Sequence, residues 1–232
     1  MTPRRSRLRS WMLLARISNL PTIWTNVLAG LALTTEGPAW SSYLWLAASM
    51  SCFYTGGMFL NDAFDRDIDH RERPSRPIPA GDVSASEVFG IGFALLAAGA
   101  LLLVPTPTAL PWGLALGVAI VVYDMRHKGS RLGPFVMGLC RGLVYCTVAA
   151  AVAVVTPVVL LAAAGLTAYV AGLTQVAKLA GASARWLVPA LIAGISLVDA
   201  ALVAFHAPLV LAAAAVLGFP LTLFLQRFVP GD

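Results

Sequence analysis

The residues best suited to chemistry lie in one segment, NDAFDRDID at positions 61–69, which directly follows a long apolar stretch. At about 100° per residue in a helix, Asp62, Asp65 and Asp69 fall on one stripe, whereas Asp67 points to the other side. Like charges on one stripe repel each other, so beside lipid they require cations. Mg²⁺ favours such hard oxygen ligands, usually together with water and phosphate oxygens. The stripe therefore predicts a metal-bridged diphosphate at the edge of a membrane.

The loop that follows the aspartates supplies cations. Its sequence, HRERPSRPIPAGD at positions 70–82, contains three prolines within six residues, which exclude a helix and stiffen the chain. Arg73 and Arg76 are thereby expected to lie close to the carboxylates. Arginine offers planar, paired donors to phosphate oxygens. The alternative for each is a solvated arginine on the cytoplasmic side.

A second loop, at positions 123–131, again joins an acid, bases and an aromatic residue. Lys128 is suited to bind a diphosphate as a point charge. Tyr123 could donate to an ester oxygen or flank a cationic carbon with its ring face. The competing interpretation of Tyr123 is a place in the aromatic belt at the membrane interface.

Arg141 is unusual because it lies inside an apolar segment that begins at Pro134, about 10 Å deep at 1.5 Å per residue. Gly138 and Gly142 flank it at a spacing that allows two helices to approach closely. A charge at that depth favours a functional role, with the aspartate stripe or a diphosphate as its partner, and snorkelling is the alternative. Asn26 is a weaker pocket candidate, balanced against a plain hydrogen bond between helices.

Composition places these residues in a membrane protein. The chain is 59% hydrophobic and 12% charged, with a mean hydropathy of +0.80, which excludes an ordinary soluble domain. In lipid, spanning segments of about 20 apolar residues fold as helices. We therefore expect an all-α polytopic membrane protein, a single domain over residues 1–232 that forms a bundle of about eight transmembrane helices. The predicted spans are Ala15–Thr34, Ser41–Leu60, Ser84–Val104, Thr108–Tyr123, Pro134–Val155, Pro157–Ala177, Leu187–Phe205 and Pro208–Gln226.

The basic residues predict the orientation. All sixteen Lys and Arg lie in the N-terminal tail, in the regions 61–83, 124–133, 178–186 and 227–232, or within two turns of that side. The positive-inside rule then predicts an integral protein of the cell (inner) membrane, with both termini and the site facing the cytoplasm. The net charge of +5 indicates attraction to anionic membrane lipids and not to nucleic acid. Asp199 and His206 lie at or near the opposite side and are interpreted as structural.

Taken together, these motifs resemble the UbiA family of intramembrane prenyltransferases. NDAFDRDID fits the family pattern N-D-x-x-D-x-x-x-D, RPSRPIPAG is similar to its segment ending R-P-[IL]-P-x-G, and the 123–128 loop is similar to its tyrosine/lysine loop. The resemblance implies Mg²⁺-dependent transfer of a prenyl group from an allylic prenyl diphosphate to an aromatic or other hydrophobic acceptor within the membrane. It implies that Asn61, Asp62, Asp65 and Asp69 hold Mg²⁺ and the diphosphate, and that Arg73, Arg76 and Lys128 neutralise the leaving group. Together with the residues argued from position and charge, the predicted catalytic residues are Asp62, Asp65, Asp69, Tyr123 and Lys128. The predicted substrate-binding residues are Asn26, Asn61, Arg73, Arg76, Arg141 and Lys178.

Two departures from the family pattern leave alternatives open. The family has nine transmembrane helices, and a second aspartate motif is expected where this chain has GLTQVAKLAG at positions 172–181. Lys178 stands there instead. Three explanations remain open: the lysine replaces the charge of one metal ion as a fixed cation for the diphosphate, the substrate carries a different headgroup, or the protein has lost transferase activity. The chain thus resembles a divergent branch, with the EboC-like one as a candidate. The alternative function is a non-catalytic component that binds or transports lipids or prenyl diphosphates; the sequence identifies no protein partner.

Overall fold

The computed structural model describes residues 5–34, 40–126, 130–179 and 187–231, and their regular structure is helical. Short helices lie at the start and in the first large loop, and long ones make up most of the remainder. In chain order they are α1 (Arg7–Leu14), the 3₁₀ turn η1 (Ile17–Asn19), α2 (Leu20–Ala32), α3 (Trp40–Phe64), α4 (Arg66–Glu72), α5 (Ala85–Leu103), α6 (Leu110–Arg126), α7 (Gly133–Val152), α8 (Pro157–Leu179), α9 (Leu187–His206), α10 (Leu209–Val216) and α11 (Gly218–Gln226).

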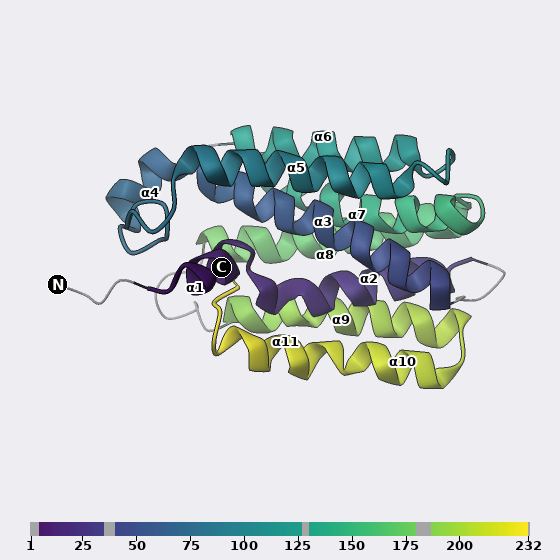
Figure 1. The fold of residues 1–232 in the computed structure, drawn as a ribbon. Coiled ribbons are helices and arrows are strands. Elements are labelled where there is room, and N and C mark those ends of the chain that lie inside the picture. Colours follow the sequence, from purple (N-terminus) through teal and green to yellow (C-terminus); the bar gives the residue numbers. More distant parts are fainter. Residues whose placement is uncertain (1–4, 35–39, 127–129, 180–186, 232) are drawn as a thin grey trace.

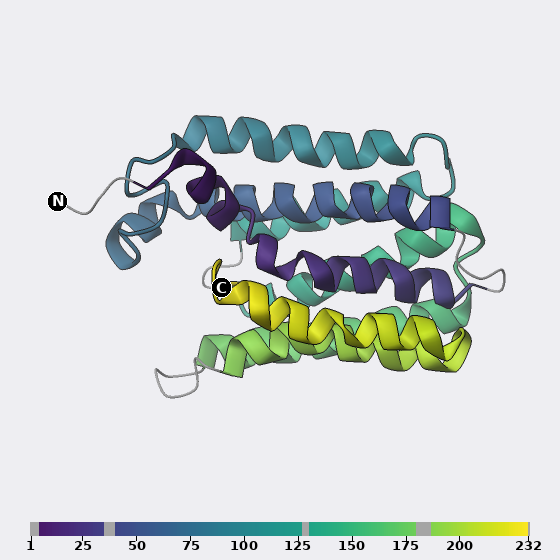
Figure 2. The ribbon, with the colours of Figure 1, turned by 60° about the horizontal axis from the view of Figure 1, so that its bottom comes forward.

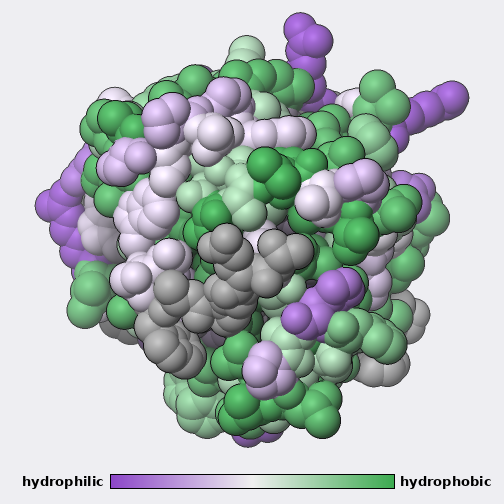
Figure 3. All heavy atoms as spheres, turned by 90° about the vertical axis from the view of Figure 1, so that its right-hand side faces the viewer, coloured by the Kyte–Doolittle hydropathy of each residue, from purple (hydrophilic) through white to green (hydrophobic). Residues whose placement is uncertain are grey.

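The long helices lie side by side in one bundle, and both ends of the chain lie at the end that carries α1 and α4 (Figures 1 and 2). The opposite end carries the short connections, such as those between α5 and α6 and between α9 and α10. Strongly hydrophilic residues are few on the part of that end which Figure 3 colours. The two ends of the bundle therefore differ in polarity as the distribution of basic residues predicts.

Five helical segments are long and apolar enough to cross a membrane: Ala85–Leu103, Gly133–Val152, Pro157–Leu179, Leu187–His206 and Leu209–Gln226. The last joins α10 and α11, which follow each other with a single residue between them. Each of the eight predicted spans contains an α-helix, although α2, with 13 residues, is only about 20 Å long. The all-helical membrane fold is confirmed, and the number of crossings stays a prediction.

The first predicted span begins differently from the prediction. The chain is not α-helical from Ala15 to Asn19, because Arg16 adopts a left-handed conformation (φ 42°, ψ 49°) and η1 follows it. Pro21 then stands in the first turn of α2, where its missing N–H costs no hydrogen bond. The break ends α1 and turns the chain, and it leaves Arg16 beside the end of α3.

The aspartate stripe is divided between two helices. α3 continues past the predicted end to Phe64, Asp65 lies at the junction, and α4 carries Asp69. Backbone hydrogen bonds from Asp65 N to Asn61 O (3.0 Å) and from Asp69 N to Asp65 O (2.8 Å) keep the helical spacing across it. Asp62, Asp65 and Asp69 are accordingly all buried. The side chain of Asp67 is 77% exposed, so its opposite orientation is confirmed.

Close packing in the centre of the bundle depends on small residues. α2 is buried along almost its whole length and contacts α3, α7 and α9. The two most extensive helix–helix contacts are those between α7 and α8 and between α3 and α5. A Cβ added at Gly142 would lie 2.7 Å from the carbonyl oxygen of Ala163, and one at Gly138 would collide with the backbone of Thr167. The predicted close approach at these two glycines is therefore confirmed.

Candidate functional site

A cavity of about 920 Å³ lies within the bundle. Its volume is within the usual range of small-molecule and cofactor sites. Residues of α2, α3, α6, α7, α8 and α9 line it, together with the loop after α4. Much of the wall is apolar, including Ile23, Phe53, Leu116, Val144 and Leu173. The polar lining residues at this end of the cavity include Asn61, Asp65, Arg73, Arg76, Tyr123, Asp124 and Lys178.

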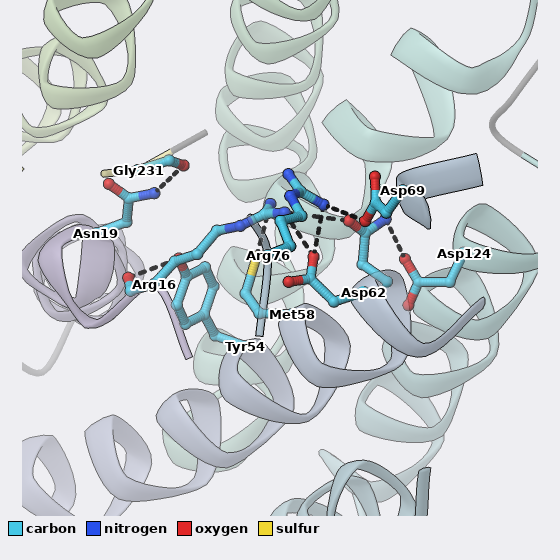
Figure 4. A network of polar contacts seen from close by, with 10 residues as sticks. Arg16, Asn19, Tyr54, Met58, Asp62, Asp69, Arg76, Asp124 and Gly231 are labelled. Atoms are coloured by element: carbon cyan, nitrogen blue, oxygen red, sulfur yellow. Dashed lines mark hydrogen bonds and ion pairs between the residues drawn. The ribbon is translucent and has the colours of Figure 1, made fainter. Parts of the chain in front are cut away.

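Two arginines from different segments hold the carboxylates at this site (Figure 4). Arg76 Nη1 bridges Asp62 Oδ1 (3.0 Å) and Asp69 Oδ2 (2.8 Å), so the proline-rich loop folds back over the junction of α3 and α4. Arg16 Nη2 donates to the same Asp62 oxygen at 3.0 Å. The carboxylates avoid mutual repulsion because these guanidinium groups lie between them.

A fourth carboxylate, Asp124, joins this group from α6. Asn61 Nδ2 donates to Asp124 Oδ1 at 3.2 Å, and Asn61 Oδ1 accepts from Arg16 Nη2 at 3.3 Å (Figure 4). Asp124 Oδ2 is buried, and among the described residues no group donates a hydrogen bond to it. A buried carboxylate oxygen without a donor is costly unless a cation or water satisfies it. This oxygen of Asp124 is therefore a candidate ligand for a further cation beside Asn61.

The donor set suits a magnesium ion that shares its coordination with a substrate. Within the part of the chain that the structure describes, no three Asp, Glu, His or Cys side chains converge into a closed metal cage. Mg²⁺ usually needs only one or two carboxylates, because waters and phosphate oxygens complete its octahedron. Asp65, Asp124 and the Asn61 amide line the cavity and offer such oxygens. Asp62 and Asp69 lie behind them and are engaged by arginines.

The remaining candidates at this end have different positions. Tyr123 is half-buried and lines the cavity, and Arg73 is exposed and also lines it. Lys178 reaches the cavity from the end of α8, and its Nζ donates to the carbonyl oxygen of Ser130 at 3.3 Å. Lys128 lies outside the described residues.

Arg141 lines the cavity and contacts an amide and an aromatic ring in place of the aspartate stripe. Its Nη1 donates to Asn26 Oδ1 at 2.9 Å, and its guanidinium carbon lies 5.6 Å from the centre of the Tyr54 ring. Asn26 is fully buried, is not among the lining residues, and donates through Nδ2 to both oxygens of Asp199. The partner of Arg141 is thus an amide of α2, because α7 packs against α2 at this depth.

Sequence reasoning missed three charged residues of these networks: Arg16, Asp124 and Asp199. In the sequence, Arg16 is a single charge that interrupts the first apolar segment. Asp124 stands in the charged loop at positions 123–131, where the sequence pattern favours Tyr123 and Lys128 as site residues. Asp199 was interpreted as lying near the opposite side, yet it is fully buried and accepts hydrogen bonds from α2 and α7. A lone carboxylate within an apolar segment was the available signal.

Comparison with known proteins identifies the family. The UbiA prenyltransferase family profile matches residues 23–232, and the chain therefore belongs to this family. A digeranylgeranylglyceryl phosphate synthase of Ignicoccus hospitalis is 40% identical over 96 residues, which cover 41% of this chain and 31% of that protein. A 4-hydroxybenzoate octaprenyltransferase of Vibrio parahaemolyticus is 29% identical over 123 residues, covering 51% and 42% respectively. The chain thus spans less than half the length of these curated relatives.

Solved structures share the fold over nearly the whole chain. A structure described for digeranylgeranylglyceryl phosphate synthase superimposes with a TM-score of 0.66 at 18% identity, covering 96% of this chain and 88% of that one. A UbiA homologue from Archaeoglobus fulgidus, bound to DMAPP and Mg²⁺, gives a TM-score of 0.59 at 18% identity and covers 96% and 86%. These similarities establish a UbiA-type helical bundle in the membrane.

Proposed function

We propose that this protein is a Mg²⁺-dependent prenyltransferase that moves a prenyl group from an allylic prenyl diphosphate to a hydrophobic or aromatic acceptor within the membrane. One observation carries the proposal: a cluster of carboxylates and arginines lies at one end of a cavity whose remaining wall is largely apolar. A diphosphate needs the first environment and an isoprenoid chain needs the second. The family membership and the relatives named as prenyltransferases support it.

The diphosphate would lie between the oxygens that hold Mg²⁺ and the basic side chains that line the cavity. Asn61, Asp62, Asp65 and Asp69 are the proposed metal-binding group, to which the structure adds Asp124. The bound ion would make diphosphate a better leaving group by neutralising its charge. Arg73 and Arg76 would donate hydrogen bonds to the phosphate oxygens, and Lys128 is proposed to do so from its loop.

In the reaction, the bond between C1 of the prenyl chain and the diphosphate oxygen breaks, and the acceptor forms a new bond to C1. Diphosphate leaves towards the charged end of the cavity, and the proton displaced from the acceptor leaves to water there. The apolar wall excludes water from the allylic cation. Tyr123 lines the cavity beside Asp124 and would flank the cationic carbon with its ring.

Lys178 is proposed to substitute for a second group of metal ligands. The described end of α8 carries no carboxylate, and Lys178 instead brings a fixed positive charge to the cavity. A fixed cation neutralises diphosphate without requiring a second metal ion. The same observation favours the alternative function, a component that binds or carries prenyl lipids without turnover.

The proposed location is the cell (inner) membrane, with both termini and the open end of the site facing the cytoplasm. The basic residues favour this orientation. Both termini lie at the end of the bundle that carries α1 and α4 (Figure 1). The membrane itself would supply the hydrophobic acceptor by lateral diffusion.

The test uses two aspartates of one motif. In purified protein with Mg²⁺, D65N should weaken the binding of geranyl diphosphate at least about tenfold, because it removes an oxygen charge from the metal site. The matched control D67N, at an exposed position, should bind as the wild type does. Binding of geranyl diphosphate that is unchanged without Mg²⁺ and unchanged in D65N would contradict the proposal.

Turnover separates the two functions. With membrane lipid extract as the source of acceptor, the wild type should release inorganic diphosphate and form a prenylated product, and D65N should not. Tight, Mg²⁺-dependent binding of geranyl diphosphate without any release would identify the non-catalytic component instead.

A further inference from the structure

A buried polar network lies behind the cavity and is not part of the carboxylate cluster. Both oxygens of Asp199, on α9, accept hydrogen bonds from Asn26 Nδ2 at 2.9 and 2.8 Å. Thr25 Oγ1 donates to Asp199 Oδ2 and Tyr145 OH to Oδ1, each at 2.5 Å. Asp199, Asn26 and Tyr145 are fully buried. Such a fully satisfied network holds its members in one arrangement.

This arrangement determines which end of the Asn26 amide faces the cavity. Because a carboxylate only accepts hydrogen bonds, Asp199 requires the NH₂ end of Asn26, and the carbonyl end must then point elsewhere. That end, Oδ1, accepts from Arg141 Nη1. Asp199 is therefore a positioning residue: it orients Asn26, and Asn26 orients Arg141. Asp199 makes no direct ion pair with the guanidinium at salt-bridge distance among the described residues.

Arg141 lies deeper in the bundle than the carboxylates. Its guanidinium stacks over Tyr54 of α3. Asp65, which directly follows the end of α3, comes eleven residues after Tyr54, about 16 Å further along the helix axis. Met50, Ile23 and Val144, all apolar, line the cavity as Arg141 does.

Much of the hydrogen-bonding capacity of Arg141 is available to a ligand. A guanidinium has five N–H donors, and among the described residues Arg141 has one bonded acceptor, Asn26. A cation in a mostly apolar cavity is costly unless an anion approaches it. Carboxylates and phosphates match the planar guanidinium with paired hydrogen bonds.

We propose that Arg141 is a second anion-binding subsite, which takes the carboxylate or phosphate group of the acceptor. This inference rests on the proposed function, because it assigns the diphosphate of the prenyl donor to the carboxylate cluster. The acceptor then lies along the apolar wall, with its anionic end at Arg141 and its nucleophile towards the donor. The substrate class that follows is an amphipathic acid, either an aromatic carboxylate or a glycerol ether phosphate, and not a neutral quinol or alcohol.

Binding measurements on purified full-length protein test the subsite with four probes. Geranyl diphosphate with Mg²⁺ reports on the donor site. 4-Hydroxybenzoate and an isoprenyl glycerol ether phosphate report on the two anionic acceptor chemistries, and 4-hydroxybenzamide is the neutral counterpart. The variant is R141Q, and the matched control is R71Q, at an exposed arginine that donates to the backbone oxygen of Asp67.

R141Q should weaken the preferred anionic probe at least about tenfold, because it removes charge-assisted hydrogen bonds. It should change the affinities for geranyl diphosphate and the neutral amide less than twofold, and R71Q should change none of them. The anionic probe whose affinity falls in R141Q, either the carboxylate or the phosphate, identifies the chemical class of the ligand. If R141Q does not fold, R141K, which keeps the charge and loses the planar pair, should weaken the same probe selectively.

D199N tests the positioning role. It should weaken the anionic probe selectively, because Asn26 can then turn its amide away from Arg141, whereas a general structural defect would lower all affinities in parallel. An equal loss of geranyl diphosphate binding in R141Q would place Arg141 in the donor site and overturn the proposal. So would a wild type that binds neither anionic probe. A wild type that binds an anionic probe through Arg141 but no geranyl diphosphate would refute the proposed function and leave the subsite standing.

Discussion

Single residues at the site are arranged by charge compensation. Asp62, Asp65 and Asp69 are buried together, and this is tolerable because Arg76 and Arg16 pair with two of them. Arg16 adopts a left-handed backbone conformation, which costs a residue with a side chain about 1 kcal/mol. The ion pair with Asp62 offsets that cost. Both arginines therefore act as structural counter-ions, and Arg76 does so in addition to its proposed contact with a diphosphate.

Substituting Arg76 should show how much this charge compensation contributes to the stability of the protein. R76Q should lower the free energy of unfolding by about 3 kcal/mol, because Asp62 and Asp69 lose a shared, mostly buried cation. Mg²⁺ should then raise the unfolding temperature of R76Q more than that of the wild type, since a metal ion can replace the missing charge. Thermal unfolding in detergent, with and without Mg²⁺, measures both effects.

R71Q is the matched control for that measurement, because Arg71 is exposed. It should leave both the stability and the response to Mg²⁺ unchanged. An R76Q protein as stable as the wild type would mean that the ion pairs do not hold the carboxylates together.

At the scale of elements, the pair α7–α8 keeps the wall of the cavity in place. α7 carries Arg141 and α8 carries Lys178, so the separation of these helices sets where the two cations lie. Gly138 and Gly142 allow the backbones to approach closely, since lipid offers no hydrophobic force to drive helices together. The close packing of α7 against α8, and with it the shape of the cavity wall, therefore depends on these small residues.

Adding one methyl group to α7 at Gly138 should disturb the packing of α7 against α8. G138A should destabilise the fold by about 1–3 kcal/mol, because its Cβ would collide with the backbone of Thr167, which cannot move alone. G165A on α8 is the control: its Cβ meets nothing within 4 Å, and alanine should be neutral or stabilise by up to about 1 kcal/mol. Thermal unfolding in detergent compares the two variants. Equal stabilities would show that the helices can separate without cost.

The whole molecule is polarised along the bundle. The carboxylate cluster, α1, α4 and both termini lie at one end, and the short connections lie at the other (Figures 1 and 2). The proposed prenyltransferase would receive the charged group of its donor from one aqueous side and its lipid groups from the membrane. The orientation is thus a functional property as well as a topological one.

Labelling from each side of the membrane tests the orientation. In a background with Cys52, Cys140 and Cys146 replaced by alanine, S75C should react with an impermeant thiol reagent only after the cells are permeabilised. P107C, at the opposite end, should react in intact cells. Labelling of both from the same side would contradict the predicted bundle orientation.

Ligand binding should stabilise the whole bundle, because the cavity is lined by most of its long helices. Geranyl diphosphate at a hundred times its dissociation constant, with Mg²⁺ present, should raise the free energy of unfolding by about 2.7 kcal/mol. EDTA should abolish the shift in unfolding temperature. A shift that survives EDTA would mean that the diphosphate binds to the basic side chains without metal.

The sequence alone determined the membrane class, the helical segments and the charged end of the site. It could do so because long apolar runs, a clustered acidic motif and the distribution of basic residues are local patterns with few physical solutions. It also identified Arg141 as unusual by its depth. The tertiary structure decided the partners: Arg16 and Asp124 join the carboxylates, and Asn26 binds Asp199 at one end of its amide and Arg141 at the other. Those contacts join helices far apart in the chain, and their specificity comes from side-chain directions that no local pattern encodes.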